Sequence, residues 1–272
     1  MTLNLGDVID GRYELVRRLG AGDLGEVYVA YDRPLDRRVA LRLVEPGDDA
    51  AGAALMEDTR RMNAVQFNSL SVVAMLDQGL TPEGIRYVAM ELVDGISLDQ
   101  VVVRRAPLPA EEAIRYGVEL LDACLAAGRQ AEGRSRLIPA TALVTPDGHV
   151  RVTRFADADG PGPGGAEPAC AAVATIVHRL LTGRDPGPEG PDDEIPTELD
   201  VVLGDALEGR IRTAADLRSR LRAARPASRM PAIQDDGDKL TQHTWLLVGA
   251  SLALIIVIIV LVILGAFVIG GW

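Results

Sequence analysis

Residues 12–44, RYELVRRLGAGDLGEVYVAYDRPLDRRVALRLV, decide the fold of this chain. Apolar and polar residues alternate over 12–19, 26–32 and 38–44, which is the two-residue period of a β-strand. The first two runs are joined by GAGDLG and the next two by RPLDR, and links this short suit antiparallel neighbours. We therefore predict an antiparallel meander with a glycine-rich turn between its first two strands.

Helical patterns take over further along the chain. Pro109 and Glu111 open a helix whose apolar residues Ile114, Val118 and Leu121 fall on one face. The other predicted elements are a helix over 52–66, strands over 72–77 and 85–92, a hairpin turning at 146–148, a helix over 169–182 that ends at Gly183, and a last helix from Thr213 with Asp216 in a capping box. Strands first and helices afterwards predict an α+β fold.

Charge and cysteine content exclude several classes of protein. The 272 residues have a formal net charge of -11, and residues 244–272 contain no charged side chain, so the acidic surface belongs to the rest of the chain. Nucleic-acid binding needs clustered Lys and Arg, and we therefore expect no nucleic-acid partner. Cys124 and Cys170 stand in apolar helical stretches without metal-ligand spacing. We expect both to be buried free thiols, and we predict no metal site.

The C-terminal segment predicts a membrane anchor. Residues 245–269 form an uncharged apolar run, and about 25 residues at about 1.5 Å each span the roughly 30 Å of a hydrocarbon core. Arg225, Arg229 and Lys239 precede the run, which by the positive-inside rule places the N-terminal domain in the cytosol and the C-terminus outside. We predict a juxtamembrane linker over 223–243 and a single transmembrane helix over 244–269 in the cell membrane.

Several motifs, in order along the chain, resemble those of a protein kinase. GAGDLGEV at 20–27 resembles the kinase glycine loop, VALR at 39–42 its strand VAIK, YVAMELVDGISL at 87–98 its hinge, and LVTPDGHVRVTRFA at 143–156 its segment through DFG. The chain resembles bacterial, actinobacterial-type, membrane-anchored Ser/Thr kinases over roughly residues 12–222. The resemblance implies a two-lobed kinase-like fold with an N-lobe over 12–94 and a reduced helical C-lobe over 95–222. It implies a nucleotide site made by Gly20, Gly22, Gly25, Val27, Ala40, Arg42, Met90, Glu91 and Val93, with Met90 as gatekeeper.

The chain departs from the kinase pattern where the family carries its chemistry. Arg42 stands at the position of the phosphate-binding lysine, and the helix position that normally pairs with it matches Arg60. Arg136 replaces the aspartate base, Thr141 the Mg²⁺-binding asparagine and Arg154 the DFG aspartate. An arginine cannot accept a proton at neutral pH, and Mg²⁺ prefers oxygen ligands.

These departures predict a chain that is not an enzyme. We expect a membrane-tethered pseudokinase that acts as a scaffold for a cytosolic or membrane protein partner and needs no cofactor. The alternative is a nucleotide-binding switch or a residual weak Ser/Thr kinase, which binds ATP without Mg²⁺ through the glycine loop, the hinge and Arg42. A third hypothesis makes Thr241 and Thr244, which follow acidic residues in the linker, sites of phosphorylation.

Overall fold

The computed structural model describes residues 3–65, 69–128, 135–157, 168–187 and 194–224. The chain divides into two compact units, Met1–Pro226 and Ala227–Trp272, and the second lies wholly outside the described residues. Within the described ranges, the helices are all too short or too polar to cross a membrane. The transmembrane helix over 244–269 and the linker threonines lie outside the described residues and stay predictions.

The N-terminal part of the chain forms one six-stranded antiparallel sheet with the strand order β1-β2-β3-β4-β6-β5. Its strands are β1 (Val8–Ile9), β2 (Tyr13–Gly22), β3 (Gly25–Asp32), β4 (Arg37–Val44), β5 (Met75–Leu80) and β6 (Arg86–Glu91). The meander predicted over 12–44 is confirmed, because β2, β3 and β4 pair in sequence order.

Helix α1 (Asp49–Val65) packs against one face of this sheet. Successive residues of a strand point to opposite faces, and β4 follows this rule. Its residues Leu41 and Leu43 belong to the hydrophobic cluster on the face away from α1, whereas Ala40 and Val44 pack with Leu55 of α1. Residue 42 has the same parity as 40 and 44, so β4 presents it to the α1 side of the sheet.

The C-terminal part of the described chain is helical. Its helices are α2 (Leu98–Arg105), α3 (Ala110–Gly128), α4 (Pro168–Thr182), α5 (Thr197–Leu207) and α6 (Ala214–Ala223). Helix α4 packs between α3 and α5, as its nearly uniform apolar composition predicts. Gly183 follows α4 with a φ of +78°, and the Thr213 hydroxyl accepts a hydrogen bond from the Asp216 N–H at 3.2 Å, so both predicted helix ends are confirmed.

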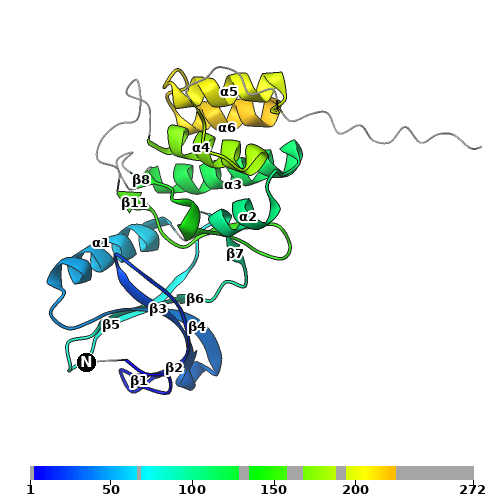
Figure 1. Cartoon of the computed structure of the whole chain (residues 1–272). Coiled ribbons are helices and arrows are strands. Elements are labelled where there is room, and N and C mark those ends of the chain that lie inside the picture. The colour runs from blue at the N-terminus through cyan, green and yellow to red at the C-terminus, as the bar shows by residue number, and fades with distance from the viewer. Residues whose placement is uncertain (1–2, 66–68, 129–134, 158–167, 188–193, 225–272) are drawn as a thin grey trace, which may run out of the picture. The chain divides into compact units, whose positions relative to one another are not determined.

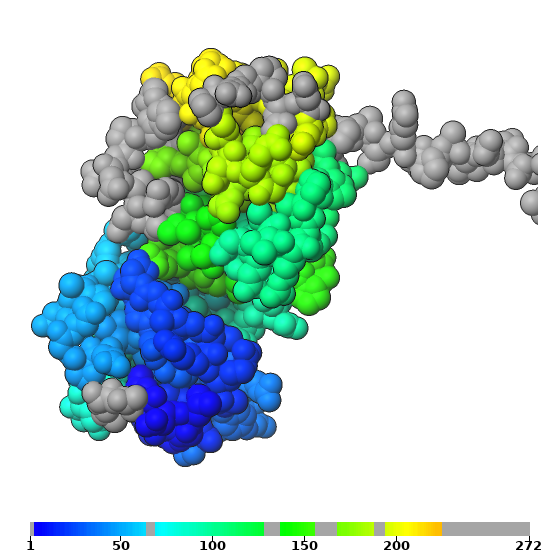
Figure 2. Space-filling model, viewed as in Figure 1, coloured from blue at the N-terminus to red at the C-terminus, as the bar shows by residue number. Residues whose placement is uncertain are grey.

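Two small sheets connect the sheet domain with the helices. The first joins β7 (Ile96–Ser97), β9 (Ala142–Val144) and β10 (Val150–Val152), and the second pairs β8 (Ser135–Arg136) with β11 (Ala156–Asp157). The chain crosses from the large sheet to the helices between β6 and β7 (Figure 1). The Val73 N–H donates to the Val152 carbonyl at 2.9 Å, which fastens the strand-rich part (blue to cyan in Figure 2) to the helical part.

The contact between α3, α4 and α6 depends on a glycine. A Cβ at Gly117 of α3 would lie 2.6 Å from Val177 Cγ2 and 3.4 Å from Leu221 Cδ1. We expect Gly117→Ala to lower the free energy of unfolding by about 1–3 kcal/mol, because the β-branched valine cannot rotate away from the added methyl group. Urea-induced unfolding followed by circular dichroism measures the effect.

Gly204 in α5 provides the matched control. A Cβ there meets no atom within 4 Å, so Gly204→Ala should raise the free energy of unfolding by up to about 1 kcal/mol, as alanine does in a helix. Equal stabilisation by the two substitutions would show that α3 and α4 do not pack as closely as described.

Candidate functional site

The glycine-rich turn lies at the tip of the β2–β3 hairpin, where Gly22 pairs with Gly25. Gly25 has a φ of +87°, and a Cβ there would overlap the Leu43 carbonyl of β4, so only glycine fits. A Cβ at Gly20 or Gly22 would meet no atom within 4 Å. The side of the hairpin that carries these two glycines is therefore open, and it leaves room for a ligand to approach the backbone.

The residues predicted to surround an adenine lie on neighbouring strands. Ala40 on β4 pairs with Met90 on β6, both are buried, and Val27 on β3 packs against the same cluster. The Glu91 N–H donates to the Ala74 carbonyl at 2.9 Å. The N–H of Val93 forms no backbone hydrogen bond to another residue within the described ranges. The structure thus brings the small, apolar and hinge residues of the prediction together.

A side-chain contact holds the hinge in place. The carboxylate of Glu91 accepts a hydrogen bond from Arg151 of β10 at 2.5 Å. The resemblance implies a place for Glu91 in the nucleotide site, but no local pattern links its side chain with a residue sixty positions later. This ion pair joins the end of the large sheet to the first small sheet.

Arg42 lies half-buried on the face of β4 that is turned toward α1. Burial lowers the pKa of the Arg42 guanidinium, and the positive charge of Arg154 lowers it further, while the carboxylates of Asp58 and Asp23 oppose the change. Arg42, Arg154, Asp23 and Asp58 are therefore close enough to act on one another, and we call these four residues the arginine cluster.

The match of Arg60 to the helix position that pairs with residue 42 is wrong. The Arg60 side chain is 75% exposed and pairs with Glu57 on the outer side of α1, whereas Asp58 supplies the helix charge that acts on Arg42. Each helix residue is rotated by about 100° from the one before it, so a shift of two positions moves a side chain to the opposite side. The helix charge that acts on the pKa of the strand arginine is therefore the carboxylate of Asp58, opposite in sign.

Arg154 and Asp23 form a bidentate ion pair. The Arg154 Nη1 and Nη2 atoms donate to Asp23 Oδ1 and Oδ2 at 2.7 and 2.9 Å. The Arg154 side chain is only 12% exposed, whereas that of Asp23 at the hairpin tip is 69% exposed. The hydrogen bonds from Arg154 hold the pKa of Asp23 below its usual value. The ion pair ties the tip of the glycine hairpin to the segment before β11.

The residues that correspond to the Mg²⁺ ligands of kinases do not suit a hard dication. The Thr141 hydroxyl lies 3.0 Å from the carbonyl oxygens of both Ile138 and Arg154, which share its single proton as acceptors. Arg154 presents a guanidinium instead of a carboxylate, and cations repel. Arg136 pairs with Ala156 through its backbone in β8, and its side chain lies outside the described part of the structure.

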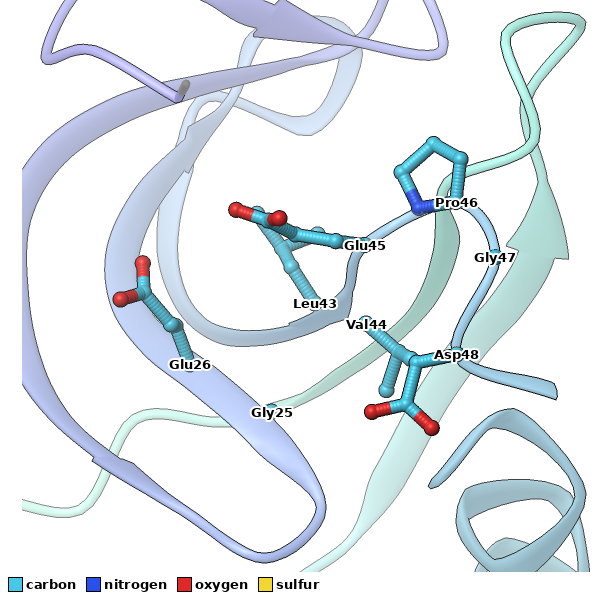
Figure 3. Close-up of a pocket in the computed structure, with 8 residues that line it drawn as sticks. All are labelled: Gly25, Glu26, Leu43, Val44, Glu45, Pro46, Gly47 and Asp48. Atoms are coloured by element: carbon cyan, nitrogen blue, oxygen red, sulfur yellow. The ribbon is translucent and has the colours of Figure 1, made fainter. Parts of the chain in front are cut away.

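Two open cavities are found in the described part of the structure, and neither is lined by Asp23, Arg42 or Arg154. One of about 490 Å³ surrounds the end of β4 and is lined by Gly25, Glu26 and residues 43–48 (Figure 3). The other, of about 450 Å³, lies among β7, α3 and the β9–β10 turn. The charged side chains that line the first cavity are the carboxylates of Glu26, Glu45 and Asp48, which repel a phosphate.

Comparisons with known proteins agree with the fold. No family model matches the chain. A probable serine/threonine-protein kinase of Clostridium perfringens is 30% identical over 152 residues, which cover 56% of this chain and 22% of that protein. The serine/threonine-protein kinase PknD of Mycobacterium tuberculosis is 30% identical over 221 residues, or 79% of this chain and 32% of PknD. The crystal structure of the M. tuberculosis PknI kinase domain superposes with a TM-score of 0.61 at 24% identity, covering 82% of this chain and 97% of that domain.

These relatives correct one prediction. The prediction that the chain is not an enzyme is wrong, because the relatives at 30% identity are Ser/Thr protein kinases and point to an enzyme. The chain spans less than half of each curated relative described here, so the matches concern the kinase part of those proteins. Its fold is the two-lobed fold of protein kinases, and its relatives are bacterial Ser/Thr protein kinases.

Proposed function

We propose that this chain binds an adenine nucleotide between its two lobes and acts as a slow Ser/Thr protein kinase. One observation carries the proposal: the fold brings Arg42 and Arg154 together beside an open glycine hairpin. Phosphoryl transfer depends chiefly on positioning and on neutralising the charge of the phosphates, and two guanidinium groups supply positive charge for that purpose.

The adenine part of the site follows from residues that already lie together. Ala40 and Met90 offer a small and an apolar surface on adjacent strands, and Val27 closes the site from the hairpin. The Val93 N–H and the Glu91 carbonyl are the hinge groups that an adenine edge would bind, since the Glu91 N–H is already bonded to Ala74. Each of these residues belongs to the set predicted from the sequence.

The arginines explain why the proposed reaction is slow. General base catalysis contributes about 10²–10⁴-fold to a proton-transfer step, and an arginine at position 136 cannot provide it because its pKa stays above about 12. Electrostatic stabilisation by Arg42 and Arg154 remains, as in phosphoryl-transfer sites where an arginine neutralises developing charge. We therefore propose a turnover well below the roughly 1–100 s⁻¹ that is usual for kinases.

Calorimetric titration of ATP into the purified full chain in detergent tests the nucleotide site. Binding with one site per chain supports the proposal. Adenosine at saturating concentration should compete for this site and lower the apparent affinity for ATP. A chain that binds neither ATP nor adenosine, while its thermal unfolding shows it to be folded, would contradict the proposal. Partner proteins and the membrane anchor stay predictions.

A further inference from the structure

We infer that Asp23 occupies the phosphate position on Arg154, so that a nucleotide polyphosphate binds by displacing this carboxylate and does so without Mg²⁺. The inference rests on the proposed nucleotide site. It adds that Asp23 blocks the phosphate position of that site and that the site prefers the metal-free ligand.

The two partners of the ion pair differ in exposure, and Asp23, the exposed one, is the partner that leaves. Arg154 is almost buried and stands beside β11, whereas Asp23 is exposed at the tip of a two-strand hairpin. The Asp23 carboxylate can turn into water and stay solvated, whereas Arg154 then lacks a counter-charge until an incoming phosphate replaces it. The guanidinium stays in place and offers the same two parallel N–H groups to the next anion.

The geometry of the pair is also that of a phosphate contact. Both Nη atoms of Arg154 donate to the two carboxylate oxygens of Asp23, at 2.7 and 2.9 Å. Arginine binds phosphate through the same fork of two N–H groups. Two oxygens of a phosphate group can therefore replace the Asp23 oxygens without any movement of Arg154.

The charges of the arginine cluster favour a multivalent anion in this position. With Asp23 in place, the guanidinium groups of Arg42 and Arg154 face the carboxylates of Asp23 and Asp58, and the cluster is balanced. When Asp23 leaves, a half-buried site retains one excess positive charge. A polyphosphate supplies more negative charge than Asp23 does, and the two guanidinium groups, which act on one another electrostatically, both attract it.

The same residues oppose a bound Mg²⁺ ion. A dication would enter a cluster that already contains two guanidinium groups, and Thr141 directs its hydroxyl proton to carbonyl oxygens of the chain. Chelation by Mg²⁺ also lowers the negative charge that a polyphosphate presents to the arginines. Free polyphosphate is therefore the preferred ligand of this site, and its Mg²⁺ complex binds more weakly.

Titrations of inorganic tripolyphosphate and of ATP into the full chain in detergent, in EDTA and in excess Mg²⁺, test the inference. Asp23→Ala should bind both ligands about tenfold more tightly in EDTA, because the competing carboxylate is gone. Asp23→Ala combined with Arg154→Ala should lose this gain. Mg²⁺ should weaken binding of either ligand.

Glu83→Ala is the matched control, since Glu83 is an exposed carboxylate at the β5–β6 turn of the same sheet. It removes one negative charge at a distance from the arginines and should leave the affinity within about twofold of the original. Circular dichroism confirms that each variant is folded.

The outcomes separate this inference from the proposed function. If Asp23→Ala binds ATP no more tightly than Glu83→Ala, or if either ligand binds only with Mg²⁺, the inference is wrong while the nucleotide site stands. If tripolyphosphate behaves as expected but adenosine does not bind, the inference stands and the adenine site is wrong. If neither ATP nor tripolyphosphate binds to any variant, both are wrong.

Discussion

Arg42→Met is expected to weaken ATP binding about 10- to 100-fold, because it removes a half-buried guanidinium from the proposed phosphate site. A hydrogen bond to a charged group contributes about 1.5–3 kcal/mol, which corresponds to this range of affinity. Methionine has about the size and apolar character of the aliphatic part of arginine, so it can fill that space on the α1 face of β4. Calorimetric titration of ATP into the variant measures the loss.

Arg60→Met is the control for this substitution. Arg60 lies on the outer side of α1 with 75% of its side chain exposed, so its loss should leave ATP affinity within about twofold. Equal losses in the two variants would contradict the assignment of Arg42 to the phosphate site. They would favour a general effect of net charge on the binding of an anion.

Asp32→Asn is expected to lower the free energy of unfolding by about 3 kcal/mol. The Asp32 side chain is fully buried and accepts hydrogen bonds from Arg12 at 2.7 and 2.9 Å and from Arg37 at 3.3 Å. An asparagine turns an N–H₂ group toward these donors and removes one of the two carboxylates that bind Arg12, the other being Asp77 at 2.8 Å. Urea-induced unfolding at pH 7 measures the difference.

Glu14→Gln offers a comparison on the surface of the same sheet. The pair of Glu14 with Arg33 is largely exposed, with 40% and 49% of the two side chains accessible. Exposed pairs contribute about 0–1 kcal/mol, so this variant should remain close to the original in stability. A cost as large as that of Asp32→Asn would show that burial is not what makes Asp32 important.

The contribution of Asp32 should also depend on pH. Its hydrogen bonds from Arg12 hold the pKa of the folded state below the value of about 3.9 in an unfolded chain. Stability that arises from a lowered pKa is fully present above the unfolded pKa and is lost as the pH falls through the folded pKa. The difference between the original protein and Asp32→Asn should therefore be constant between pH 5 and 7 on this account and shrink below about pH 4.

The sequence predicted the strands and most helices because their signals are local. The two-residue alternation over 12–44 and the apolar stripe of 114–121 each depend on a few neighbouring residues, and β2, β3, β4 and α3 follow them. Helix α2 was not predicted, since its eight residues include two arginines and little apolar periodicity. Short elements such as this depend on tertiary packing, here of Leu98 and Val101 in the core.

The site was predicted less completely than the fold, because its contacts join distant segments. Asp23 and Arg154 are 131 positions apart, and no periodicity relates them. The structure pairs Asp23, at the tip of the glycine hairpin, with a cation from the DFG-like segment. The choice of Arg60 over Asp58 failed for a different reason: a resemblance without a fixed helix register does not specify which side chain faces the sheet.

The error about catalysis has the same origin. Arg42, Arg136 and Arg154 are each a loss relative to a kinase motif, and three separate losses predict a chain that is not an enzyme. The relatives at 30% identity are kinases, and the structure arranges two of these arginines with two carboxylates as one electrostatic cluster. The proposed function depends on the combined charge of such a cluster. Comparing a motif one residue at a time does not show that combined charge.

Transfer of the γ-phosphate is the measurement that tests the central claim most directly. The full chain in detergent is incubated with γ-labelled ATP and a basic protein substrate, with Arg42→Met as control, and label on serine or threonine is counted over hours. We predict transfer about 10²–10⁴-fold slower than the roughly 1–100 s⁻¹ of an ordinary kinase, and at least tenfold faster than in Arg42→Met. Label incorporation that is the same in the original chain and in Arg42→Met, or absent from both, would contradict the account.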